Sequence, residues 1–392
     1  MPQPSSKIIT TVLRALIVFL LLCLISGCTR SKDTNDRESL FVANRGSNSV
    51  TVIDATEFKQ LATVPVGIQP VQVVANTVRN EVYAVNEQSS SISVIAVDTN
   101  QVSATISVPA RPVFLSVSTD GTRGYIAHAG SSSLTVLDLT QHHVLASVPL
   151  GTNATSTAIA VDGHTIIVPL NAARINNSEP VSSVAIVDTV KLQVRARILL
   201  PGCVSPGETV ILPDSTKAFI ACGGTNLVAA VQLKTTNGKS DRDALLCLMT
   251  VGHSPTALAL KPDGGELFAI DRDSDAFSEI NTSTNEVGGT YSIGNHPAGG
   301  VMAADNATLY VGNSGSNNVA IYDITVNRLL ASVPVGEGPE ALALNSNQNF
   351  LFVANQRSGD ITIIRTGTRS LFTFIHAGKE PVSLAVKSWT TR

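Results

Sequence analysis

Short apolar runs alternate with polar turns along most of the chain. The segment 40–75 contains four such runs, at 40–44, 48–54, 61–66 and 71–75. Runs of this length with alternating apolar positions are typical of half-buried β-strands, and Gly, Ser, Asn and Asp are typical of the turns between them. The pattern therefore predicts a four-stranded antiparallel sheet for this segment.

The pattern of four runs recurs along the chain. The second residue of its first run falls at 41, 83, 125, 167, 219, 268, 310 and 352, so most intervals are 42 residues and two are longer, at 52 and 49. The proline before the fourth run keeps the same spacing and is replaced once, by Ala154. Such a period is typical of repeat architectures built from one supersecondary unit. The first runs are 40–44, 82–86, 124–128, 166–170, 218–222, 267–271, 309–313 and 351–355.

Proline positions predict the order of the strands. Pro65, Pro149 and Pro334 lie in third runs, and proline cannot donate to a sheet ladder, so we expect the third run at the outer edge of each sheet. The fourth run then becomes the inner strand of the next sheet. The last such run, 382–386, would complete the sheet that begins at Leu40. The sequence therefore predicts an all-β fold, a single β-propeller with eight blades by repeat count (seven as the alternative), closed by the C-terminal strand.

The first residues have the features of a secretory leader. Lys7 and Arg14 are the charged residues before Cys28, and the uninterrupted apolar run 15–25 is too short to span a bilayer. It ends in Ser26-Gly27-Cys28. This ending resembles the lipobox of bacterial lipoproteins, which implies a lipidated Cys28; an ordinary signal peptide is the alternative. We expect a signal peptide at 1–27, the lipidated cysteine and a flexible tether at 28–39, the propeller at 40–388 and a tail at 389–392.

The formal charge of the whole chain is −3, and charged residues make up 15% of it. A mildly acidic chain lacks the clustered Lys and Arg that phosphate backbones require. We therefore expect no nucleic-acid partner.

The repeat itself resembles a known family. Val50–Asp54, Val64–Pro70, Leu134–Asp138, Val148–Gly151, Val319–Asp323 and Val333–Pro339 follow the unit Val-x-Val-Ile-Asp and Val-Pro-Val-Gly-x-x-Pro. This unit is similar to that of the YVTN-repeat β-propellers, which include YncE-like proteins and some surface-layer proteins. The resemblance implies the fold; it leaves the function open because one architecture supports many activities. Relatives include lactonase-like and quinone- or haem-dependent enzymes, and one that binds single-stranded DNA.

The sequence contains no nucleophile elbow, zinc motif or phosphate-binding glycine loop. The segment 271–275 has the alternating acids of a calcium loop but lacks its glycine, so we interpret it as a turn. Haem would need an axial histidine, for which His253 and His296 are the candidates. We expect no metal and no cofactor.

The loops between each outer strand and the next inner strand should open on one face of the ring. Their residues differ from unit to unit, which favours a binding site for an asymmetric ligand, although a variable solvated rim is the alternative. We expect Asp271 and Arg272 to extend the charged side of this rim. The predicted rim residues are Arg111, His253, His296, Glu337, Lys379, Glu380, Asp271 and Arg272.

The cysteines suggest one cross-link. Cys203 precedes the inner strand of the fifth blade and Cys222 ends the neighbouring strand, so both should lie at the same end of adjacent strands. Cys247 should lie two strands away, beyond bridging distance. We expect a Cys203–Cys222 disulfide, with three free thiols as the alternative.

These observations favour a non-enzymatic binding or scaffold protein, monomeric and lipid-anchored in the bacterial cell envelope. The threonine after Cys28 favours the outer membrane, by analogy with lipoprotein sorting. The partner would be the membrane together with an envelope protein, a peptide or a glycan. The alternatives are a propeller enzyme, either lactonase-like or quinone- or haem-dependent, and, less favoured, binding of single-stranded DNA.

Overall fold

The computed structural model describes residues 36–173 and 179–390. The chain divides into a unit Glu38–Trp389 and a second unit made of Met1–Arg37 with Thr390–Arg392. The predicted signal peptide and the predicted lipidation site Cys28 lie outside the described residues. No helix among the described residues is long and apolar enough to cross a membrane.

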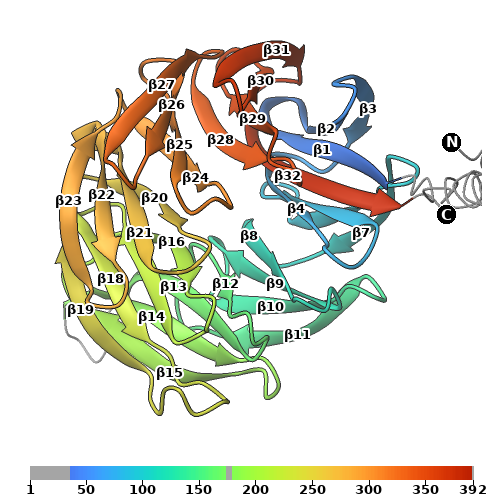
Figure 1. Cartoon of the computed structure of the whole chain (residues 1–392). Coiled ribbons are helices and arrows are strands. Elements are labelled where there is room, and N and C mark those ends of the chain that lie inside the picture. The colour runs from blue at the N-terminus through green and yellow to red at the C-terminus, as the bar shows by residue number, and fades with distance from the viewer. Residues whose placement is uncertain (1–35, 174–178, 391–392) are drawn as a thin grey trace, which may run out of the picture. The chain divides into compact units, whose positions relative to one another are not determined.

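The unit Glu38–Trp389 consists of eight four-stranded antiparallel sheets (Figure 1). From the inner to the outer strand, the sheets are: β32 (Pro381–Thr390), β1 (Asp36–Asn44), β2 (Ser49–Asp54) and β3 (Gln60–Pro65); β4 (Pro70–Ala75), β5 (Glu81–Asn86), β6 (Ser91–Ala96) and β7 (Gln101–Ser107); β8 (Pro112–Val117), β9 (Arg123–His128), β10 (Ser133–Asp138) and β11 (His143–Pro149); β12 (Ala158–Ile159), β13 (Thr165–Ala173), β14 (Val181–Asp188) and β15 (Gln193–Leu200); β16 (Pro206–Ile211), β17 (Lys217–Cys222), β18 (Leu227–Gln232) and β19 (Ala244–Thr250); β20 (Pro255–Leu260), β21 (Glu266–Asp271), β22 (Ala276–Asn281) and β23 (Glu286–Ser292); β24 (Pro297–Met302), β25 (Thr308–Asn313), β26 (Asn318–Asp323) and β27 (Arg328–Pro334); β28 (Pro339–Leu344), β29 (Phe350–Asn355), β30 (Asp360–Arg365) and β31 (Ser370–His376). Two 3-10 turns, η1 (Arg45–Ser47) and η2 (Arg272–Ser274), follow β1 and β21. We number the sheets as blades one to eight in this order.

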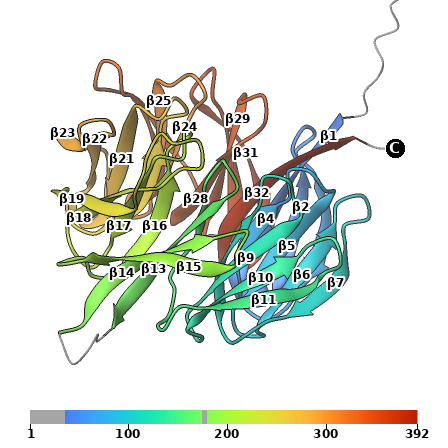
Figure 2. The same cartoon turned by 90° about the horizontal axis from the view of Figure 1, so that it is seen from below.

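The predicted propeller of eight blades is confirmed, including the position of each third run as the outer strand. The C-terminal strand β32 completes blade one beside β1, and the two strands run together in both views (Figure 2). The boundaries differ from the prediction. β1 begins at Asp36, so the extended strand takes up the last residues assigned to the tether, and Trp389 lies inside β32 instead of after it.

Each junction between blades has its own apolar core. Phe41 and Val50 of blade one, for example, pack in one cluster with Val82 and Ala84 of blade two. The middle strands are buried on both faces, as in β2 and β5, whereas an outer strand such as β7 alternates exposed and partly buried positions. Burial of both faces therefore marks the middle strands, and exposure of one face marks the edge strand.

A contact between a glycine and an asparagine explains two positions that recur in half of the repeats. The glycine lies three residues before the inner strand, and the buried asparagine ends the second strand. The asparagine amide donates to a side-chain oxygen on the third strand, as Asn44 Nδ2 does to Thr51 Oγ1 at 2.8 Å and Asn313 Nδ2 does to Asn318 Oδ1 at 2.8 Å. A Cβ on the glycine would lie closer than 3.0 Å to the asparagine side chain, so only glycine allows this approach. The pairs are Gly378 with Asn44, Gly67 with Asn86, Gly294 with Asn313 and Gly336 with Asn355.

The predicted disulfide is confirmed. Cys203 and Cys222 are bonded, with their Cα atoms 5.3 Å apart. Cys247 on β19 is a free cysteine. The bond ties the loop before β16 to the end of β17 within blade five.

Candidate functional site

The rim loops have a common backbone. The residue before the proline of the inner strand has a left-handed conformation in seven blades, with φ of 53° at Arg111, 47° at His296 and 54° at Glu380. Its carbonyl oxygen accepts a hydrogen bond from the loop that follows the second strand, as Arg111 O does from Ala129 N at 2.9 Å. The backbone is therefore fixed by the fold, and the side chains are free to differ.

Several predicted rim residues are engaged in local ion pairs. Arg111 Nη2 lies 2.7 Å from Glu87 Oε1, and Glu380 Oε2 accepts from Arg45 Nε at 3.0 Å. Exposed pairs of this kind contribute roughly 1 kcal/mol or less to stability. These ion pairs fix the positions of the side chains on the rim, and the charged groups remain in contact with water.

The structure does not bring all the predicted rim residues into one pocket. Arg111 precedes blade three and His296 precedes blade seven, so they lie on opposite sides of the ring. His253 and His296 are both exposed on rim loops. Arg272 lies in the η2 turn, and the exposed Glu337 contributes its amide to Ser358 Oγ at 2.9 Å.

Asp271 does not extend the rim, and the prediction was wrong on this residue. Its side chain is fully buried, because it occupies the position that the buried asparagine takes in other blades. Its Oδ2 accepts a hydrogen bond from Ser278 at 2.6 Å, while Oδ1 has no partner among the described residues. Burial raises the pKa of Asp271 to about 6.

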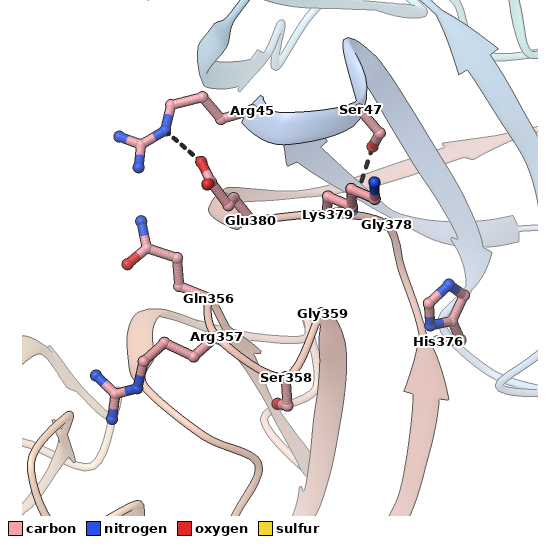
Figure 3. A pocket seen from close by; sticks show the side chains of 10 residues that line it. All are labelled: Arg45, Ser47, Gln356, Arg357, Ser358, Gly359, His376, Gly378, Lys379 and Glu380. Atoms are coloured by element: carbon pink, nitrogen blue, oxygen red, sulfur yellow. Dashed lines mark hydrogen bonds and ion pairs between the residues drawn. The ribbon is translucent and has the colours of Figure 1, made fainter.

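A pocket of about 710 Å³ lies on this face where blades eight and one meet (Figure 3). It contains Glu380 and Lys379 from the predicted rim, together with side chains from the η1 turn and from the turn after β29. The lining residues are Arg45, Ser47, Gln356, Arg357, Ser358, Gly359, His376, Gly378, Lys379 and Glu380.

The pocket has an excess of positive charge. It contains three basic side chains, those of Arg45, Arg357 and Lys379, and one acidic side chain, that of Glu380. Arg357 Nη2 donates to Ser314 O at 2.5 Å and to Asn317 Oδ1 at 3.1 Å, which holds the guanidinium in place without neutralising it. Lys379 forms no ion pair with any residue that the structure describes. The arrangement suits an anionic ligand.

Sequence reasoning missed Arg45, Gln356, Arg357 and His376. The first three follow the asparagine that ends a second strand, where the repeat usually has a Ser, Gly or Asn turn. Arginine occurs in three of the turns that follow a second strand, those of blades one, six and eight, and the first and last of these were the available signal. Only ring closure makes these two blades neighbours.

No group of three or more His, Cys, Asp or Glu side chains that could hold a metal ion occurs within 36–173 or 179–390.

A family model described as "Lactonase, 7-bladed beta-propeller" matches residues 276–373, from β22 into β31. The comparison with curated proteins gives no match. Solved structures with similar folds include hydrazine synthase from Kuenenia stuttgartiensis (22% identity, TM-score 0.56, 84% of this chain and 92% of that chain). Dihydro-heme d1 dehydrogenase NirN in complex with DHE has 12% identity and a TM-score of 0.71, over 90% of this chain and 75% of that chain.

A 6-phosphogluconolactonase candidate from Bacteroides fragilis has 15% identity and a TM-score of 0.61, over 92% of this chain and all of that chain. At these identities the likeness supports the fold alone. Taken with the partial family match, the comparisons agree that the chain is a β-propeller.

Proposed function

We propose that this chain is a lipid-anchored binding protein of the bacterial cell envelope whose rim pocket takes an anionic ligand. The observation that carries the proposal is the meeting of Arg45, Arg357 and Lys379 around one pocket. Its volume, about 710 Å³, falls within the range common for small-molecule sites.

The donors of the pocket remain available to a ligand. Arg45 donates a hydrogen bond from Nε to Glu380, and Arg357 donates from Nη2 to the Ser314 carbonyl oxygen and the Asn317 amide oxygen. The other N–H groups of each guanidinium form no hydrogen bond with the described residues, so they can donate to a ligand. Figure 3 shows the side chains of Arg45, Gln356 and Arg357 extending to the same side of the pocket. Two guanidinium groups and an amide can bind carboxylate or phosphate oxygens with several directed hydrogen bonds.

The anchor and the location are proposed from the leader. A lipid on Cys28 would hold the propeller at a membrane of the envelope, with the outer membrane favoured by Thr29. YVTN-type, YncE-like membership belongs to the same proposal, because it is supported by the repeat motif.

Isothermal titration calorimetry with 6-phosphogluconate, which carries a phosphate and a carboxylate, tests the proposal. We expect binding to the parent protein, no binding of glucose, and a loss of at least about tenfold in affinity for Arg45→Ala with Arg357→Ala. Lys191→Ala, which removes an exposed cation from a turn of blade four, is the matched control and should bind as the parent does. Equal binding by the double variant, or no binding by the parent, would contradict the proposal.

A second candidate is lactone hydrolysis. The partial match to lactonase-type propellers favours it. Release of acid from a δ-lactone, followed with a pH indicator, should then be faster with the parent than with the Arg45→Ala, Arg357→Ala variant. If the parent protein binds 6-phosphogluconate but does not accelerate hydrolysis of the lactone, lactone hydrolysis is excluded and the binding function stands.

A further inference from the structure

A second pocket, of about 460 Å³, lies in the central channel of the ring. Figure 1 shows β4, β8, β16 and β28 among the strands nearest the centre of the ring. The lining residues come from these strands, from β32 and from the segment before β12: Val71, Gln72, Val113, Phe114, Thr155, Ser156, Gly207, Glu208, Thr209, Ala341, Val382 and Ser383. Glu208 is the one charged residue among them.

Glu208 takes part in a recurring bridge between inner strands. The residue two places after the inner-strand proline binds the backbone of the next blade: Gln72 Oε1 accepts from Leu115 N at 2.7 Å, and Ser383 Oγ accepts from Val73 N at 3.1 Å. Glu208 Oε2 accepts from Leu258 N at 3.2 Å in the same way. An amide or a hydroxyl can form this bridge, as Gln72 and Ser383 show. The bridge therefore does not require the negative charge of Glu208.

Among the described residues, the carboxyl group of Glu208 also forms no ion pair. Its Oε1 forms no hydrogen bond with the described residues. The side chain reaches the solvent of the channel, yet the surrounding protein raises the pKa of Glu208 to about 7. The other charged residues on inner strands are Glu340 of β28, which is not among the lining residues, and Lys387 of β32, whose Nζ donates to Asn76 O at 2.6 Å.

The hydroxyl groups beside Glu208 present acceptors to the pocket. Thr155 Oγ1 donates to Pro206 O at 2.5 Å, while Ser156 Oγ and Thr209 Oγ1 donate to Gly207 O at 2.6 and 3.2 Å. Each hydroxyl hydrogen is thus already used, and what remains for a ligand are oxygen lone pairs. A carboxylate beside three acceptor oxygens favours a ligand whose charged end is rich in donors.

We propose that the channel binds an organic ammonium ion, with its charged group at Glu208 and its apolar part against Val113 and Phe114. An ammonium supplies three donors and a positive charge. The apolar walls and the aromatic ring of Phe114 select a cation with a hydrocarbon body over a hydrated metal ion. This site is separate from the rim pocket and does not depend on it.

Calorimetric titration with benzylammonium, with benzyl alcohol as its neutral counterpart, tests the proposal. We expect benzylammonium to bind and benzyl alcohol not to bind. Affinity should fall by about tenfold between about pH 8 and about pH 6, because Glu208 becomes protonated. Glu208→Gln should abolish binding and keep the melting temperature, since Gln72 shows that an amide can form the bridge; Glu340→Gln is the matched control and should bind as the parent does.

Three results would overturn the proposal. They are equal binding of benzyl alcohol, benzylammonium binding that survives Glu208→Gln, and stabilisation by potassium or calcium ions alone that depends on Glu208. If Glu208→Gln does not fold, Glu208→Ser takes its place, because Ser383 shows that a hydroxyl can also form the bridge; benzylammonium binding that survives Glu208→Ser excludes Glu208 as the binding group.

Discussion

Cys203 and Cys222 occupy in blade five the positions that a loop glycine and a buried asparagine occupy in other blades. Cys203 lies three residues before Pro206, as Gly67 does before Pro70, and Cys222 ends β17 as Asn86 ends β5. Elsewhere this approach is so close that a Cβ on Gly67 would lie 2.7 Å from Asn86 Cγ. In blade five the same proximity, with Cα atoms 5.3 Å apart, is used for a covalent bond.

We expect the double substitution Cys203→Gly with Cys222→Asn to restore the ordinary pair of the repeat. The parent should lose about 3 kcal/mol of stability when reduced, since the bond closes a loop with a sequence separation of 19 residues. The double variant should fold and unfold identically with and without reductant. Denaturant titrations of both proteins with and without dithiothreitol measure this, and a parent that does not respond to reductant would contradict it.

Asp271 predicts a dependence of stability on pH. Burial raises its pKa from 3.8 to about 6, so the folded state binds the proton more tightly than the unfolded state. The contribution of Asp271 to the free energy of unfolding is fully present below about pH 4. It is lost as the pH rises towards 6, and the total loss is about 3 kcal/mol. Asp271→Asn should remove this loss and stabilise the protein above pH 6, as denaturant midpoints across this range would show.

The converse substitution is the control for Asp271. Asn86 is equally buried in blade two, so Asn86→Asp should introduce a loss of stability in the same pH range and of the same order. If Asp271→Asn leaves the midpoint unchanged above pH 6, the carboxyl of Asp271 is not buried as described.

Gly378 should tolerate no side chain. A Cβ there would lie 2.7 Å from Asn44 Cγ and 2.8 Å from Ser47 Oγ, so Gly378→Ala should cost roughly 1–3 kcal/mol. Gly367, in the turn after β30, has open space around it, and Gly367→Ala should be neutral or slightly stabilising. Thermal melts of the two variants compare them directly, and equal melting temperatures would argue against the glycine–asparagine contact.

Cys28→Ser tests the proposed anchor. We expect the variant to leave the membrane fraction or to keep its leader, because no acyl chain can be attached to serine by a thioether bond. Cys23→Ser, five residues earlier in the leader, should remain anchored and processed. Membrane fractionation and intact mass of the three proteins give the answer, and a Cys28→Ser protein that fractionates as the parent would exclude the anchor.

The order of the blades and strands follows from local signals that recur in every repeat. A proline such as Pro65 marks an outer strand because it cannot donate to the ladder, and the spacing of 42 residues returns each element to an equivalent place. The same local reasoning placed Cys203 and Cys222 at one end of adjacent strands. It failed for Asp271, because whether a polar residue at a strand end is buried depends on the loop that packs over it.

Only the tertiary structure decided which side chains from distant repeats meet. Arg45 and Glu380 are 335 positions apart in the sequence and become partners because β32 closes the ring beside β1. Glu208 lines the channel pocket, and no Lys or Arg side chain is among the described residues that line it with Glu208. This absence depends on the residues that the other inner strands place around the channel. The repeat determines the backbone conformation at each position, because the same local constraints act in each unit. The partner of a side chain, however, often belongs to a different unit, and the residue type at that position differs from unit to unit.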